Sequence, residues 1–259
     1  MLQQGARGAM TRCCLYRRSS GLFGASKSYL FCLDAGLAEP GDILASTNKK
    51  SSGLHTSYTI KCGNGDEPIG KLKSDSSGTE FVLFGPGVNA SRLSLWDDDA
   101  REHTQVRQQL ASISYSRTVV AKSTFLSATY GPRAVVCRLK VADLQRPEEA
   151  TRAHTLRNKP PTWDARQQTW ALDFGGRAPM VSSKNVQLHL EQTESQGEPS
   201  AEHSPSSLRY PQGVLQVGKV SRNAFTVDYT WPLTGLQALG IALSAFEPKR
   251  SSKGPFDVF

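Results

Sequence analysis

The sequence lacks the features that mark membrane-spanning and secreted proteins. Its 259 residues contain no run of 18 apolar residues, so a transmembrane helix is not predicted. The N-terminus has no apolar segment like that of a secretory signal, although its arginines leave a transit peptide open. We therefore expect a protein that is soluble or peripheral to a membrane.

Signatures of enzymes and metal sites are also missing. The five cysteines show no CxxC spacing, and the five histidines are scattered, so neither a disulfide framework nor a zinc site is predicted and a reducing compartment fits best. No GxSxG or HExxH motif occurs. A G-x-x-x-x-G-K match ends at Lys71, but Leu72 follows where a P-loop needs Ser or Thr. We expect no catalytic residue, no metal and no cofactor.

Basic residues are in excess. The chain holds 31 Lys and Arg against 23 Asp and Glu, a net charge of +8. The first 73 residues contribute ten of the basic and five of the acidic residues. This asymmetry indicates an anionic partner, which can be a nucleic acid, a lipid surface or a phosphorylated ligand.

One segment near the end, Leu233 to Phe246, is apolar on every side of a helical wheel. Such a helix must be buried all round. At about 1.5 Å per residue it spans about 21 Å, which is too short to cross a membrane. Pro232 suits the first turn of this helix, and Pro248 stops it.

Most of the remaining chain is predicted to form short strands. Alternation and turn residues indicate ten to twelve strands without a βαβ rhythm, the clearest being Ala134–Val141 and the hairpin around Asp75–Gly78. Residues 48–53 are expected to form a basic loop, and 89–112 to contain a short helix. We predict an all-β barrel threaded by the C-terminal helix.

We expect one domain over residues 11–247. A short extension, 1–10, precedes it, and a basic tail, 248–259, follows it. Residues 193–213 are rich in Ser, Glu and Pro and are expected to form a polar surface loop. A hairpin within 162–174 carries Trp163 and Trp170, which we interpret as core residues.

Lys71 and Lys73 form the clearest candidate site. They lie two apart on a predicted strand, so both ammonium groups project from one face while Leu72 points to the core. Two neighbouring cations repel each other unless an anion lies between them, and lysine is a common phosphate ligand. The alternative is a pair of solvated lysines on an exposed face.

The chain resembles the C-terminal domain of the tubby family. The resemblance rests on TRCCLYRRSS, IGKLKSDSSGTEF, LRNKPPTWD and FTVDYTWPL, in order along residues 11–247. It implies a closed barrel of twelve antiparallel strands around a hydrophobic C-terminal helix. It also implies binding of the phosphatidylinositol 4,5-bisphosphate headgroup, with reversible attachment to the plasma membrane from the cytoplasm.

The resemblance assigns further residues to that site. Lys71 and Lys73 match the family's phosphate-binding pair, Arg133 its binding arginine, and Ser57 a headgroup-contacting asparagine. Lys49 and Lys50 match a basic loop near the pocket. Lys73 stands in place of an arginine, and Asp75 and Glu80 are expected to add negative charge near the anion.

Two other functions compete with this hypothesis. A basic groove on a barrel would also attract nucleic acid, as a transcription-related protein requires, and nuclear entry is left open. A lipid-moving protein of the scramblase type shares a similar barrel but uses its helix as a membrane anchor, which the burial expected here disfavours. We expect a monomer with a signalling or trafficking role whose cargo the sequence does not reveal.

Overall fold

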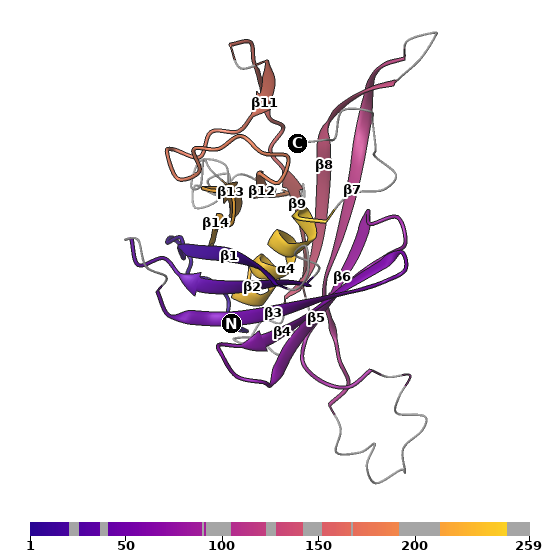
Figure 1. Ribbon diagram of the computed structural model, residues 1–259, viewed down its shortest axis with the longest axis vertical. Coiled ribbons are helices and arrows are strands. Elements are labelled where there is room, and N and C mark those ends of the chain that lie inside the picture. The colour runs from indigo at the N-terminus through magenta and orange to yellow at the C-terminus, as the bar shows by residue number, and fades with distance from the viewer. Residues whose placement is uncertain are drawn as a thin grey trace, which may run out of the picture.

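The computed structural model describes residues 1–20, 26–36, 41–89, 91, 105–122, 128–141, 152–166, 168–191 and 213–247. In these residues twelve antiparallel strands close into a barrel, which confirms the predicted fold class (Figure 1). Around the barrel the order is β1-β14-β13-β12-β9-β8-β7-β6-β5-β4-β3-β2. The barrel strands are β1 (Cys13–Ser20), β2 (Ser26–Leu33), β3 (Ile43–Ser52), β4 (His55–Cys62), β5 (Pro68–Ser74), β6 (Glu80–Phe84), β7 (Gln109–Lys122), β8 (Ala128–Val141), β9 (Arg152–Asn158), β12 (Val186–Leu190), β13 (Leu215–Lys219) and β14 (Ala224–Tyr229).

Helix α4 (Gly235–Ala245) lies inside the barrel, and all eleven of its residues are buried (Figure 1). Thr234 caps its start, because the Thr234 hydroxyl accepts from the Gln237 amide at 3.1 Å and the Gln237 side chain accepts from the Thr234 amide at 2.9 Å. This reciprocal capping box starts the helix two residues after its predicted start. Pro232 therefore lies before the cap rather than in the first turn.

The few polar groups of α4 are satisfied by the barrel wall. The Gln237 carboxamide donates to the carbonyls of Leu110 and Lys140 at 3.1 and 3.2 Å. Near the other end, the hydroxyls of Ser244 and Tyr115 lie 2.8 Å apart. Because a buried polar group without a partner costs free energy, these bonds make one position of the helix in the barrel preferable to others.

Residues 1–10 pack against the start of α4, although we expected them to precede the domain. The Gly5 amide donates to the Leu233 carbonyl at 2.8 Å, and the Leu236 amide donates to the Met1 carbonyl at 3.0 Å. The Arg7 guanidinium lies 4.2 Å from the centre of the Trp231 ring. The N-terminal residues therefore cover the end of the barrel at which the helix begins.

Three local predictions were wrong. The expected basic loop at 48–53 falls mostly in strand β3, and the C-terminal part of the expected helix in 89–112 is the start of β7, while residues 90 and 92–104 of that stretch lie outside the described residues. Trp163 and Trp170 lie on a separate two-stranded sheet, β10 (Thr162–Asp164) and β11 (Thr169–Ala171), which projects from the barrel (Figure 1). Their side chains are 54% and 42% exposed and pack edge to face rather than into the core.

Two other predictions concern residues that the structure does not describe. The polar loop at 193–213 lies outside the described residues except for Gly213, and so does the tail at 248–259. In the described part of the chain, no helix combines the length and the apolar character needed to cross a bilayer.

Arg177 ties the segment after β11 to the barrel wall. Its guanidinium binds both carboxylate oxygens of Asp228 at 2.9 and 2.7 Å and one oxygen of Asp34 at 2.5 Å. Asp228 is only 1% exposed and also accepts the Cys13 amide at 3.3 Å. The hydrogen bond from Arg177 lowers the pKa of Asp34. One cation thus holds two carboxylates that come from distant parts of the sequence.

We expect Arg177→Gln to lower the free energy of unfolding by about 2–4 kcal/mol, because it leaves a buried carboxylate without its cation. The pKa of Asp34 is lowered in the folded protein. The part of the stability that ionised Asp34 contributes is therefore fully present above the ordinary Asp pKa of about 3.9, and it is lost as the pH falls through the pKa of the folded state. Urea unfolding at several pH values measures both effects, with the exposed Arg166→Gln as control. Equal stability of the wild type and Arg177→Gln at neutral pH would contradict this.

Candidate functional site

Strand β5 presents its two lysines to the outside of the barrel. Leu72 between them is 0% exposed and points into the core, while Lys71 is half-buried and Lys73 is exposed. Neighbouring strands hold β5 on both sides, with Lys73 opposite Ser57 of β4 and Val82 of β6. Side chains alternate along a strand, so Lys71 and Lys73 lie on one face, as the sequence predicts.

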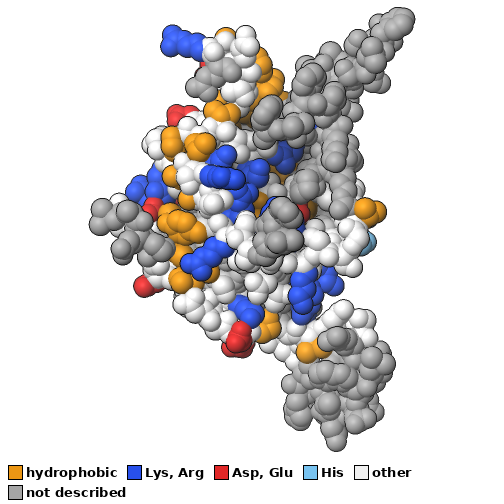
Figure 2. All heavy atoms as spheres, viewed as in Figure 1, with side chains coloured by type: hydrophobic (Ala, Val, Ile, Leu, Met, Phe, Trp, Pro, Cys, Tyr) orange, Lys and Arg blue, Asp and Glu red, His pale blue; other side chains and the backbone are white. Residues whose placement is uncertain are grey.

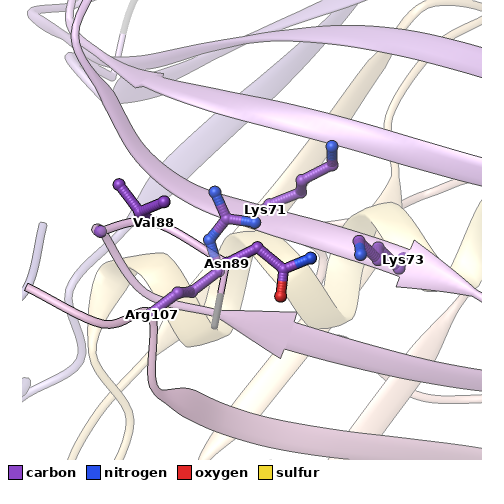
Figure 3. Close-up of a pocket in the computed structure, with 6 residues that line it drawn as sticks. Lys71, Lys73, Val88, Asn89 and Arg107 are labelled. Carbon is purple, nitrogen blue, oxygen red and sulfur yellow. The ribbon is translucent and has the colours of Figure 1, made fainter. Parts of the chain in front are cut away.

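A pocket of ≈ 310 Å³ lies over this face. Its lining residues are Lys71, Lys73, Gly87, Val88, Asn89 and Arg107. In Figure 3 the side chains of Arg107 and Asn89 reach toward β5, from which the two lysines project. Three cationic side chains and one carboxamide therefore meet at one open hollow of the surface, a combination that suits an anion.

Arg107 is brought to the pocket by backbone hydrogen bonds between two loop segments. The Val88 amide donates to the Gln105 carbonyl, and the Arg107 amide donates to the Val88 carbonyl, both at 2.9 Å. Gly87 makes this approach possible. It has a φ of +107°, and a Cβ there would lie 2.5 Å from the Gln105 oxygen. Only glycine adopts this conformation readily beside another backbone.

Of the other predicted site residues, Ser57 and Lys50 extend the outer face beside Lys73. Ser57 lies opposite Lys73, and Lys50 lies opposite Ser57 on β3. Each step between strands is about 4.8 Å, so Lys50 is about 10 Å from Lys73 along the sheet. Neither residue lines the pocket itself. Ser57 and Lys50 therefore lie beside the pocket, on the outer face of the barrel.

Lys49 does not belong to this face, which corrects its predicted place. It lies opposite the buried Tyr58, so its side chain points inward at the end of the barrel. Its ammonium binds the two oxygens of Glu247 at 2.8 and 2.9 Å, just beyond the end of α4. The Tyr58 hydroxyl donates to the same carboxylate. Lys49 thus neutralises a carboxylate that is only 6% exposed.

Arg133 also lies away from the pocket. It precedes the buried Val135 of β8 by two positions, so it has the inward direction at the barrel end where α4 finishes. Its guanidinium donates to the Ser183 carbonyl. Burial raises the pKa of Tyr115, and the charge of Arg133 partly opposes that rise. Arg133, which the resemblance matched to the family's binding arginine, therefore does not line this pocket, and Arg107 is the arginine found there.

Comparison with known proteins agrees with this architecture. A family model described as Tub family matches residues 1–248. The chain belongs to the Tub family. It is 27% identical to "Tubby-like F-box protein 5" of Arabidopsis thaliana, over 95% of the chain and 72% of that protein. It is 29% identical to mouse "Tubby-related protein 1", over 96% of the chain but only 45% of that protein.

Two residues of the Tub family domain's pocket, Arg107 and Asn89, were missed by the sequence analysis. Both fall in the stretch that was interpreted as containing a short helix. The sequence held a signal for this. Apolar residues alternate with polar ones at Ala111, Ile113 and Tyr115, which indicates a strand from about Gln109 onward, and these three side chains are buried in the structure. That reading would have left Arg107 in a loop before a strand.

Two acidic residues of the Tub family domain were expected to oppose an anion near Lys73. Asp75 instead organises the β5–β6 turn, where its carboxylate accepts from the amides of Ser77, Thr79 and Glu80 at 3.0–3.2 Å. Burial opposes the charged form, but these bonds outweigh it and lower the pKa of Asp75. Glu80 accepts from the Ser114 hydroxyl at 2.7 Å. Neither carboxylate lines the pocket.

Proposed function

We propose that this Tub family domain is a non-enzymatic module that binds phosphoinositide headgroups, phosphatidylinositol 4,5-bisphosphate first among them. Through that contact it would attach reversibly to the cytoplasmic face of the plasma membrane. The observation that carries the proposal is the meeting of Lys71, Lys73 and Arg107 at one pocket. Its cellular role would be that of a trafficking or signalling adaptor.

The chemistry of the pocket suits adjacent phosphate groups. Two ammonium groups on one strand face supply charge without demanding one orientation, while the planar guanidinium of Arg107 can hold two oxygens of one phosphate. The Asn89 carboxamide can donate to a phosphate or to a ring hydroxyl. The Lys73 ammonium lies 5.7 Å from the centre of the Phe84 ring, which restricts its position without neutralising it.

The lining of the pocket favours a headgroup over a nucleic acid. Sequence-tolerant binding of single strands uses aromatic side chains on which the bases stack. None of the six lining residues is aromatic, and the exposed pair Trp163 and Trp170 lies on the β10–β11 hairpin. The pocket concentrates positive charge in a small volume, which suits clustered phosphate groups better than the extended backbone of a nucleic acid.

The direct test is co-sedimentation with phosphatidylcholine vesicles that contain one phosphoinositide, compared with phosphatidylserine vesicles of equal surface charge. We expect retention by phosphatidylinositol 4,5-bisphosphate above that by phosphatidylserine. Retention that follows surface charge alone would contradict a specific site. Tight binding to single-stranded nucleic acid without binding to any phosphoinositide would favour the competing function.

We expect Arg107→Gln to weaken vesicle binding several-fold, because each cation near an anionic lipid surface contributes about 1 kcal/mol. Arg107→Lys keeps the charge but loses the guanidinium geometry, so its loss should be smaller. Titration with vesicles gives both affinities, and Arg166→Gln serves as a charge-matched control on an exposed hairpin. Wild-type affinity in Arg107→Gln would exclude Arg107 from the site.

A further inference from the structure

Five basic residues lie at the end of the barrel where α4 finishes. Each stands two positions from a buried core residue, and for the four that lie on strands β1, β2, β8 and β13 alternation gives the side chain the inward direction. We call these residues the mouth cluster. They are Arg17 beyond Leu15, Lys27 before Tyr29, Arg133 before Val135, Lys184 before Val186, and Lys219 beyond Val217.

The pairing of the strands places the five residues at the same end. Arg17 lies opposite Tyr29 in the β1–β2 register, two positions from Lys27. Val186 lies opposite Val217, and the Lys219 amide donates to the Asn185 carboxamide at 2.9 Å, so the next inward positions, Lys184 and Lys219, are neighbours. Figure 2 shows Lys and Arg side chains gathered near the middle of the face drawn.

The cations of the mouth cluster act on one another. Lys184 is half-buried, and its pKa is lowered first by that burial and then by the charges of Arg133, Arg17, Lys219 and Lys27. A lowered pKa of a lysine means that the surroundings disfavour its charged form. The folded protein therefore holds a cation at a place where its other cations repel it.

Two members of the cluster donate hydrogen bonds to neutral oxygens. The Arg17 guanidinium donates to the Arg222 carbonyl at 2.8 Å and the Asn223 carboxamide at 3.1 Å, and Arg133 donates to the Ser183 carbonyl. The nearby carboxylate of Glu247 is bound by Lys49 and Tyr58. The end of α4, at the same end of the barrel, contributes about half a negative charge.

We propose that the mouth cluster is a second anion-binding site, distinct from the pocket at Lys71, and that it takes a ligand with several clustered phosphate groups. The five cations come from separate segments that meet at one end of the barrel, an arrangement that concentrates positive potential over a small area. Several of them are half-buried, so solvent screens their charges less than it screens charges on a flat, exposed surface. The phosphates can belong to a soluble molecule or to a lipid headgroup.

This site lies on a different part of the barrel from the pocket. The pocket is built on the outer faces of β5 and the segments that flank β6. The mouth cluster is carried by β1, β2, β8, β13 and the turn before β12, at the end of the barrel where α4 finishes. The two sites can therefore be disabled separately, and this inference does not depend on the proposed lipid function.

The test uses inorganic tripolyphosphate as the probe and isothermal titration calorimetry as the measurement. Lys71→Ala/Lys73→Ala first silences the pocket, and this variant is expected to keep tripolyphosphate binding. Addition of Lys184→Met/Lys219→Met should then lower the affinity at least tenfold. Lys140→Met/Lys159→Met removes two exposed lysines from elsewhere and should leave the affinity unchanged. Equal affinity with and without Lys184 and Lys219 would overturn the proposal.

A second readout separates binding from a structural role. Because the charged form of Lys184 is disfavoured in the folded protein, Lys184→Met should raise Tm in the absence of ligand and should reduce the rise in Tm that tripolyphosphate causes. A lower Tm in Lys184→Met, with the ligand-induced rise retained, would assign Lys184 to the fold and overturn the proposal.

Vesicles distinguish the two sources of phosphate. Binding of the pocket-silenced variant to phosphoinositide vesicles, displaced by tripolyphosphate, assigns the mouth cluster to a headgroup. Binding to tripolyphosphate without binding to vesicles assigns it to a soluble ligand. Either result supports the site, and absence of binding to both would overturn it.

Discussion

Replacement of Leu239 by aspartate is expected to abolish folding of the soluble protein. Leu239 lies at the middle of α4 and is 0% exposed, within a helix whose eleven residues are all buried. A carboxylate there would be buried among apolar side chains, and an unpaired buried charge costs several kcal/mol. The whole free energy of unfolding of a domain is about 5–15 kcal/mol. Ile241→Asp should act in the same way.

The yield of soluble protein and its thermal unfolding check this expectation. Leu54→Asp makes the same chemical change on a side chain that is 58% exposed, and it should melt like the wild type. Leu239→Met conserves volume and should cost less than about 1.5 kcal/mol. Cooperative melting of Leu239→Asp at the wild-type temperature would place α4 outside the core.

Much of this fold could be predicted because its signals are local. Alternation in Ala134–Val141 indicates a strand with one buried face, and Val135, Cys137 and Leu139 are indeed buried. The segment that forms α4 is apolar all round, which few arrangements other than a surrounding barrel can bury. The number of twelve antiparallel strands came from the resemblance to a family, and the order in which they pair was not predicted, because alternation does not say which strands are neighbours.

The site was harder to predict because its members meet through non-local contacts. Lys71 and Lys73 share a strand, so their common face follows from spacing alone. Arg107 reaches them through backbone bonds to Val88, a residue 19 positions earlier. Arg133 was placed with them by resemblance, whereas its direction is set by Val135, two positions away on β8. A loop residue's position depends on the whole fold, and a short motif does not contain that information.

Lys49 and Lys50 show how a one-residue difference changes a role. As a basic loop, both would be mobile cations near the site. In strand β3 they point to opposite sides, so Lys50 joins the outer face while Lys49 pairs with Glu247 inside the barrel end. The buried alternation of Ala45 and Thr47 continues to Lys49 and would have indicated its inward direction.

The second large effect is expected at the pocket, where Lys71→Ala/Lys73→Ala should remove binding to phosphatidylinositol 4,5-bisphosphate vesicles. Each cation close to an anionic surface contributes about 1 kcal/mol, and direct phosphate contacts contribute more. The double variant should therefore lose at least tenfold in affinity, about 1.4 kcal/mol. Stability should hold or rise slightly, because both side chains lie outside the core and their repulsion is removed. Vesicle titration and thermal unfolding on the same preparations measure the two effects.

Lys140→Ala/Lys159→Ala is the matched control for the pocket variant, since it removes the same charge from two exposed positions elsewhere. If binding depended only on net charge, both double variants would weaken equally, and the specific site would be excluded. The salt dependence gives a further distinction. Added salt should weaken binding of the wild type, though less than for a diffuse basic surface, because charges in a partly enclosed pocket are screened less. Wild-type affinity in Lys71→Ala/Lys73→Ala would move the headgroup site away from β5, and the mouth cluster would then be the next place to test.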